Sequence, residues 1–144
     1  MANFDPNGTN AVPTYPRSAL RANFVAVMNL RVDARGFQLI PQSTRCIRRF
    51  DVHELIVTEE PAAPGRKADR VAYLGFVEFQ VGGVMAVGDH VCLREQVIGV
   101  IAGFDDTHMP NHQNIVVRVA AAASGSELQI ALGQLVEFTP PTAE

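Results

Sequence analysis

The chain has 144 residues, of which 47% are hydrophobic and 19% are charged, and its net charge at pH 7 is -3. These values are typical of one globular domain with a sizeable core, and they exclude global disorder. The acidic balance, without interleaved aromatic and basic residues, argues against nucleic-acid binding. No run of about 18 apolar residues is present and residues 1–16 lack a secretory layout, so we expect a cytoplasmic protein outside the membrane.

Short strands are expected along almost the whole chain after a polar, proline-containing arm. Apolar and β-branched residues recur at strand length, and turn-forming residues separate them. Segments 24–32 and 37–40 are expected to form a hairpin, and Arg94 and Glu95 to form a tight turn. Helical periodicity is almost absent. The expected strands are residues 24–32, 37–40, 45–57, 71–79, 85–93, 96–102, 115–119, 127–132 and 134–138.

This pattern predicts an all-β fold, namely a single small antiparallel barrel, closed or partly closed, with about eight to ten short strands and little helix. We expect an arm over residues 1–17, the barrel domain over residues 18–138 and a tail over residues 139–144. The two cysteines, Cys46 and Cys92, lie in apolar strand patterns. They are expected to be reduced core residues rather than nucleophiles or metal ligands.

The most polar loop, residues 104–114, joins two apolar strands and is where we expect function. His108 and His112 are four residues apart in it, and in a helix that spacing would place both imidazoles on one face for a metal ion. Pro110 lies between them and disfavours a helix, and no cysteine or glutamate motif completes a ligand set. We therefore expect no metal and no cofactor.

The same loop offers groups for proton transfer and substrate contact. His108 is a candidate catalytic residue, because the unperturbed pKa of histidine lies near neutrality. His112 and Asn114 are candidate polar contacts to a substrate. Phe104 and Met109 form either a small core of the loop or an apolar wall for an aromatic substrate.

Three glutamates, Glu54, Glu78 and Glu95, are candidates for a carboxylate acid/base. A carboxylic acid inside an apolar barrel has a raised pKa, which makes it usable near neutral pH. His53 and Glu54 are adjacent in an extended segment, so they point to opposite faces, and one of them is expected to be interior. The alternative is a solvent-facing Glu54 beside a His53 with an ordinary core hydrogen bond.

Three arginines, Arg45, Arg48 and Arg49, form a basic cluster on one segment. Such a cluster binds a substrate carboxylate or phosphate bidentately, or it forms a solvated or inter-subunit face. The second interpretation would make the protein a homo-oligomer assembled through this segment and the polar arm, and we expect a homodimer.

The order of Val-Gly-Asp-His-Val at 87–91, a Gly-containing apolar strand at 97–103 and His-Gln-Asn-Ile-Val-Val-Arg at 112–118 resembles the glucitol/sorbitol-specific IIA component of the bacterial sugar phosphotransferase system. The phosphoryl-accepting His of that family would fall near Leu74 or Gly75, where this chain has no imidazole. The resemblance therefore implies the scaffold without its phosphate relay.

The chain also looks like the small bacterial enzymes of β-carboline alkaloid biosynthesis, which join a tryptophan-type amine and an aldehyde by Pictet-Spengler cyclisation. This resemblance implies Glu95 as the acid/base, Arg70 as the anchor of a substrate carboxylate and Asn114 as a further contact. We expect a biosynthetic enzyme whose partners are an aromatic amine and an aldehyde. The alternative is a non-catalytic carbohydrate or metabolite-binding module on the phosphotransferase-like scaffold.

Overall fold

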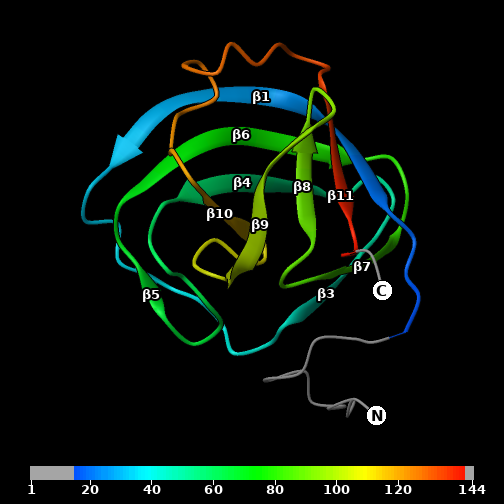
Figure 1. Ribbon diagram of the computed structural model, residues 1–144, viewed down its shortest axis with the longest axis horizontal. Coiled ribbons are helices and arrows are strands. Elements are labelled where there is room, and N and C mark those ends of the chain that lie inside the picture. The colour runs from blue at the N-terminus through cyan, green and yellow to red at the C-terminus, as the bar shows by residue number, and fades with distance from the viewer. Residues whose placement is uncertain (1–14, 142–144) are drawn as a thin grey trace.

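A closed seven-stranded barrel with two small accessory sheets forms the fold in the computed structural model, which describes residues 15–141 (Figure 1). The barrel order is β1-β11-β8-β9-β10-β4-β6, and β2 pairs with β5 and β3 with β7 outside it. The expected all-β barrel is confirmed, and the described residues contain no helix. The strands are β1 (Leu20–Val32), β2 (Phe37–Gln38), β3 (Thr44–Ile47), β4 (Val52–Thr58), β5 (Lys67–Ala68), β6 (Val71–Phe79), β7 (Gly83–Ala86), β8 (His90–Leu93), β9 (Gln96–Asp105), β10 (Asn114–Val119) and β11 (Leu135–Thr139).

The barrel is mixed, which corrects the expectation of a purely antiparallel one. Strand β10 pairs with β4 in parallel, with Asn114 opposite Glu54 and Val117 opposite Val57. The other barrel pairs are antiparallel. Parallel pairing places residues of the same alternation phase side by side on one face, so Glu54 and Asn114 are neighbours.

Strand β4 is buried on both of its faces. Its inward side chains, such as Leu55 and Val57, belong to the main core inside the barrel. Its outward Ile56 belongs to a second core on the outer face of the barrel wall, with Phe37 and Leu39 packed against it. Burying an apolar side chain of this size contributes about 1.5–3 kcal/mol. A strand that is covered on both faces can hold polar side chains away from water on either side.

The expected hairpin between 24–32 and 37–40 is wrong. Both sides of β1 are taken, because it pairs with β11 along one side and with β6 along the other. The second segment is shortened to β2, which pairs with β5 and buries Phe37 in the second core. Burial against the barrel wall therefore decides its position.

The segment 127–132 was expected to be a strand but forms turns instead. The Ser124 hydroxyl accepts from the Glu127 backbone N–H at 3.2 Å, and the Glu127 carboxylate accepts from the Ser124 N–H at 2.8 Å. Gln129 has a φ of 57°, which no strand accommodates. The reciprocal Ser-x-x-Glu bonds form a capping box, a turn signal that outweighs the apolar residues of this segment.

The expected strand 45–57 is broken by a turn between β3 and β4. The Arg48 carbonyl accepts from the Asp51 N–H at 3.1 Å, and the Asp51 carboxylate accepts from the Arg48 N–H at 3.0 Å. The expected turn between β8 and β9 is confirmed, because Arg94 and Glu95 both have the positive φ that a two-residue hairpin turn requires.

Both ends of the chain extend past the described residues, so residues 1–14 of the expected arm and 142–144 of the tail lie outside them. Arg17 lies near the start of the described residues and forms a two-pronged ion pair with Asp89. Its Nη2 and Nη1 lie 2.7 and 2.9 Å from the two carboxylate oxygens. Cys46 and Cys92 are free thiols as expected, but Cys46 is exposed and Cys92 half-buried, so neither lies in the core. Among the residues described, no helix has the length and apolar character needed to cross a membrane.

Candidate functional site

Polar side chains gather on the outer face of the barrel, where β4 and β10 begin. The parallel register brings the buried Glu54 beside the buried Asn114. The segment that precedes β10 adds His112, whose Nε2 lies 3.5 Å from the Glu54 Oε1. His108 stacks near His112, with 5.2 Å between the ring centroids. The site therefore combines a carboxyl group, two imidazoles and an amide.

The amide of Asn114 is held in one orientation by Asp105 on β9. The Asn114 Nδ2 donates to the Asp105 Oδ2 at 2.9 Å, and the same carboxylate accepts from the backbone N–H and the hydroxyl of Thr107. The Asn114 Oδ1 is consequently turned away from Asp105, and it is buried without a hydrogen-bond partner.

His112 has one ring nitrogen that is bonded and one that is not. Its Nδ1 lies 2.7 Å from the Asn111 Oδ1, so Nδ1 carries the proton in this arrangement. Its Nε2 is buried without a hydrogen-bond partner and faces Glu54. A protonated Glu54 would supply the hydrogen that the His112 Nε2 lacks.

Burial raises the pKa of Glu54 to about 7, against the opposing effect of the nearby Arg35 charge. Burial also lowers the pKa of His112, and the neighbouring His108 adds to this, while the side chain of Asn114 acts the other way. Because burial disfavours both charged forms, the 3.5 Å contact joins a protonated acid to a neutral imidazole just below the pKa of Glu54, about 7, rather than an ion pair. Small pH changes therefore shift the protonation of the pair.

Arg35 contacts both Tyr73 and His108 at the other side of the cluster. Its Nε donates to the Tyr73 hydroxyl at 2.8 Å, and its Nη2 lies 3.3 Å from the His108 Nε2. The guanidinium also lies 4.2 Å from the ring centroid of Phe37. Since an arginine can only donate, the His108 Nε2 is the acceptor in this contact.

A cavity of about 520 Å³ opens beside His112. The β3–β4 turn forms one wall and residues 109–112 form the other. This volume lies within the range of small-molecule sites. The lining residues are Arg45, Cys46, Arg48, Phe50, Asp51, Val52, His53, Met109, Pro110, Asn111 and His112.

The structure brings together three of the residues expected at the site, namely His108, His112 and Asn114. Met109 lines the cavity beside His112. Phe104 is placed elsewhere, because β9 extends to Asp105 and carries Phe104 into the main core with no exposed surface.

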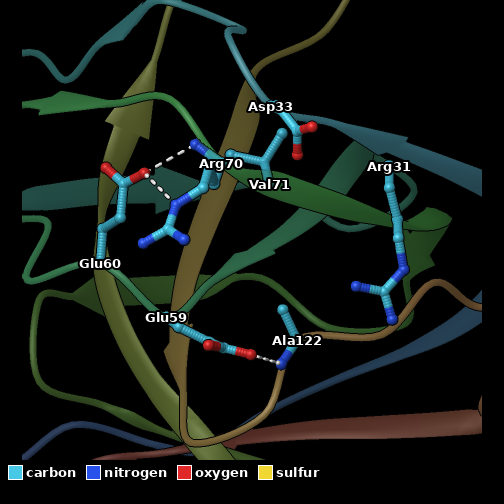
Figure 2. Close-up of a pocket in the computed structure, with 7 residues that line it drawn as sticks. All are labelled: Arg31, Asp33, Glu59, Glu60, Arg70, Val71 and Ala122. Atoms are coloured by element: carbon cyan, nitrogen blue, oxygen red, sulfur yellow. Dashed lines mark hydrogen bonds and ion pairs between the residues drawn. The ribbon is translucent and has the colours of Figure 1, made fainter.

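Glu95 and Arg70 lie apart from this cluster and line two different cavities. Glu95 is exposed in the β8–β9 turn, beside Gln134. Arg70 lines a smaller cavity of about 170 Å³, shown in Figure 2. There the Glu60 carboxylate accepts from the Arg70 backbone N–H at 2.7 Å and lies 3.7 Å from its Nε. A single chain therefore does not place Glu95 and Arg70 around one ligand.

The sequence did not point to Arg35 or Tyr73 as members of the site. Arg35 meets His108 across 73 residues of chain, so no spacing rule connects them. Glu54 was considered, but its neighbours depend on the parallel register of β10. Among the residues that the structure describes, no three His, Cys, Asp or Glu side chains are grouped so that they could hold a metal ion.

Comparison with known proteins gives one match. The model of a family of unknown function, DUF6917, matches residues 14–139. No curated protein and no solved structure matches the chain.

Proposed function

The chain belongs to DUF6917, a family of unknown function, and from its own residues we propose an enzyme that moves a proton on a small molecule, with His112 as the base and Glu54 as its carboxylate partner. The observation that carries this proposal is the 3.5 Å contact between the Glu54 carboxyl group, with a pKa of about 7, and the unpartnered Nε2 of His112. A pKa near the working pH is what acid/base catalysis requires.

The two ring nitrogens of His112 would exchange roles when Glu54 ionises. With Glu54 as a carboxylate, the favoured tautomer has its proton on Nε2, where Glu54 accepts it. Nδ1 then becomes the basic nitrogen. Its present partner Asn111 is exposed and lines the cavity, so a substrate group can replace it. After proton uptake, Glu54 stabilises the imidazolium, as the orienting carboxylate of a catalytic triad does.

Pictet-Spengler cyclisation is the specific reaction that we propose to test first. An amine and an aldehyde lose water to form an iminium ion, and the indole carbon then attacks the iminium carbon. The ring proton leaves to Nδ1 of His112, and the electrons of the broken C–H bond restore aromaticity. This assignment replaces Glu95 with the pair of His112 and Glu54, because Glu95 lies on an exposed turn away from the cavity.

The reaction is tested by incubating the protein with tryptophan and simple aldehydes and detecting a tetrahydro-β-carboline by mass spectrometry. We expect Glu54→Gln to lower kcat/KM by about 10²–10⁴-fold, the usual contribution of a positioned acid/base group, and Glu95→Gln to leave it unchanged. Loss of activity in Glu95→Gln but not in Glu54→Gln would reverse the assignment.

A test that needs no substrate follows the ring of His112 directly. Nitrogen-15 NMR separates the two tautomers, so the Nδ1-protonated form should give way to the Nε2-protonated form as the pH rises through about 7, the pKa of Glu54. Glu54→Gln should abolish this change, since Gln cannot ionise. A tautomer that does not respond to pH in the wild type would rule out the relay.

A metabolite-binding module without catalysis is the second candidate. It is favoured by one observation, that Glu54 itself is not among the residues that line the cavity. Binding of polyols by the wild type, without turnover and without a change in the His112 tautomer, would support it.

A further inference from the structure

We propose that the cavity beside the β3–β4 turn binds an organic carboxylate with an aromatic or apolar body, and that Arg45 and His53 hold the carboxylate. This inference names the substrate class of the proposed function. It rests on that function only in placing the reacting part of the ligand beside His112.

The tautomer of His53 is set by the backbone. Its Nδ1 accepts a hydrogen bond from the Gln113 N–H at 3.1 Å, so the proton of the neutral ring is on Nε2. Burial, and then the charge of Arg45, lower the pKa of His53, although Asp51 opposes them. The ring is therefore neutral near pH 7, and its Nε2–H points toward the cavity wall formed with Arg45.

Arg45 faces this same nitrogen with a donor of its own. Its Nη2 lies 3.2 Å from the His53 Nε2, and arginine can only donate. Its Nε is buried without a hydrogen-bond partner, and Nε and Nη2 lie on one edge of the guanidinium. The Nε2–H of His53 and the Nε–H and Nη2–H of Arg45 are thus three donors without an adequate acceptor. A carboxylate would supply two acceptor oxygens in the planar geometry that this edge recognises.

The charge of the cavity also favours an anion. Its charged lining groups are Arg45, Arg48 and Asp51, which give two positive charges and one negative charge, a net charge of +1. Asp51 is engaged by Arg48, whose N–H and Nε lie 3.0 and 3.5 Å from its two oxygens. The Asp51 Oδ2 is 3.6 Å from the His53 Nε2, too far for a good hydrogen bond. Arg45 is left as the uncompensated charge.

Apolar side chains at the mouth of the cavity indicate the rest of the ligand. Phe50 is 63% exposed and Met109 is 40% exposed, and both line the cavity. Phe50 has a φ of 76°, the left-handed region that is unfavourable for a bulky residue. The turn would be more stable with glycine at this position, so the aromatic ring is kept there at a cost in stability. A ring at this place contacts an apolar ligand that enters between the two walls.

The binding test uses phenylacetate as the probe and phenylacetamide as its uncharged counterpart. Isothermal titration calorimetry and NMR shifts of the His53 ring should show that the wild type binds phenylacetate at least about tenfold more tightly than the amide. Arg45→Gln should weaken phenylacetate binding by at least about tenfold. Arg66→Gln is the matched control, because it removes the same charge at an exposed position outside the cavity.

A second variant separates binding from folding. Phe50→Gly should weaken phenylacetate binding while it raises the thermal unfolding midpoint, since it relieves the left-handed strain. Equal affinities for the acid and the amide, full binding by Arg45→Gln, or binding of phenyl phosphate without phenylacetate would each overturn the proposal.

The two proposals fail in different ways. Glu54→Gln should retain phenylacetate binding, because Glu54 does not line the cavity. Phenylacetate binding with a His112 tautomer insensitive to pH would refute the relay and keep the carboxylate site. A pH-sensitive tautomer without phenylacetate binding would do the reverse.

Discussion

Glu54 carries a carboxyl group whose ionisation is opposed by burial. Its pKa is about 7 in the folded protein, against 4.5 for the free group. The folded state therefore binds the proton more tightly than the unfolded chain does. The stability that results is fully present below a pH of about 4.5 and is lost as the pH rises to about 7.

We therefore expect Glu54→Gln to stabilise the protein at alkaline pH. Gln resembles the protonated acid and can donate toward His112 and Asn114. The free energy of unfolding should rise by roughly 2 kcal/mol at pH 8, less than the full shift implies because solvent screens part of it, and should hardly change at pH 4. Urea denaturation at both pH values measures this. Glu78→Gln, at an exposed position, should change neither value.

For individual residues, the sequence predicted part of the candidate site correctly. The alternation of β4 correctly placed His53 and Glu54 on opposite faces. One of the two, His53, faces the barrel interior as expected, but Glu54 is buried as well, because a second core that includes Phe37 covers the outer face of β4. Periodicity describes the faces of a strand, but it does not reveal a distant segment that packs over one of them.

Among the elements, β1 and β6 approach each other closely at Gly75. It has a φ of 147°, and a Cβ built there would lie 2.0 Å from the Ala26 carbonyl oxygen. Gly75→Ala should therefore cost more than about 3 kcal/mol or prevent folding, because backbone atoms must move. Gly36→Ala is the control. It also has a positive φ, of 71°, but nothing lies within 4 Å, so about 1–2 kcal/mol is expected. Equal costs in urea denaturation would contradict the close contact.

The turn at 124–130 supplies a second prediction for an element. Ser124→Ala removes the hydroxyl that accepts from the Glu127 N–H and should lower the free energy of unfolding by about 1 kcal/mol. Ser126→Ala is the control, since Ser126 is an exposed serine two residues away. If both variants unfold at the same urea concentration, the capping box contributes nothing to stability.

Secondary structure was predictable where residue type and burial agree, as in 71–79, which becomes β6 with the same bounds. It was not predictable where side chains bond the backbone. Ser124 with Glu127, and Asp51 with Arg48, turn the chain within apolar segments that otherwise resemble strands. The first of these was readable as a capping box, while the second depends on a phenylalanine in a conformation that glycine prefers.

At the scale of the whole molecule, Arg17 and Asp89 tie the start of the described chain to the barrel. Their side chains are 4% and 2% exposed, and the Asp89 carboxylate also accepts from the Ala86 N–H at 2.9 Å. Asp89→Ala should lower the free energy of unfolding by about 3–5 kcal/mol, because the Arg17 charge would stay buried without a partner.

The control for this prediction is Glu127→Gln at the pair with Arg31, which has the same two-pronged geometry but is 54% and 44% exposed. It should lower the free energy of unfolding far less than Asp89→Ala does, because solvent screens an exposed pair. If Asp89→Ala and Glu127→Gln cost the same, burial does not set the strength of the Arg17 pair.

The barrel class, with closure as one of its two expected forms, followed from the sequence, but the strand order did not, and the barrel has seven strands where about eight to ten were expected. Five strands, β5 to β9, lie between β4 and β10 in the chain, and local patterns carry no information on such distant pairing. The site depends on that pairing, which explains why the sequence offered Glu54, His112 and Asn114 as candidates but did not place Glu54 beside the other two. The homodimer stays a prediction, to be measured by light scattering.

The parallel register of β4 and β10 also limits how this family can vary in length. One inserted residue within 52–58 or 114–118 would turn every following side chain of that strand to the other face and break the parallel register of β4 with β10. Insertions in the connections 59–66 and 120–134 would leave the pairing intact. Alignments of family members should therefore place their gaps in those connections and keep the two strands free of gaps.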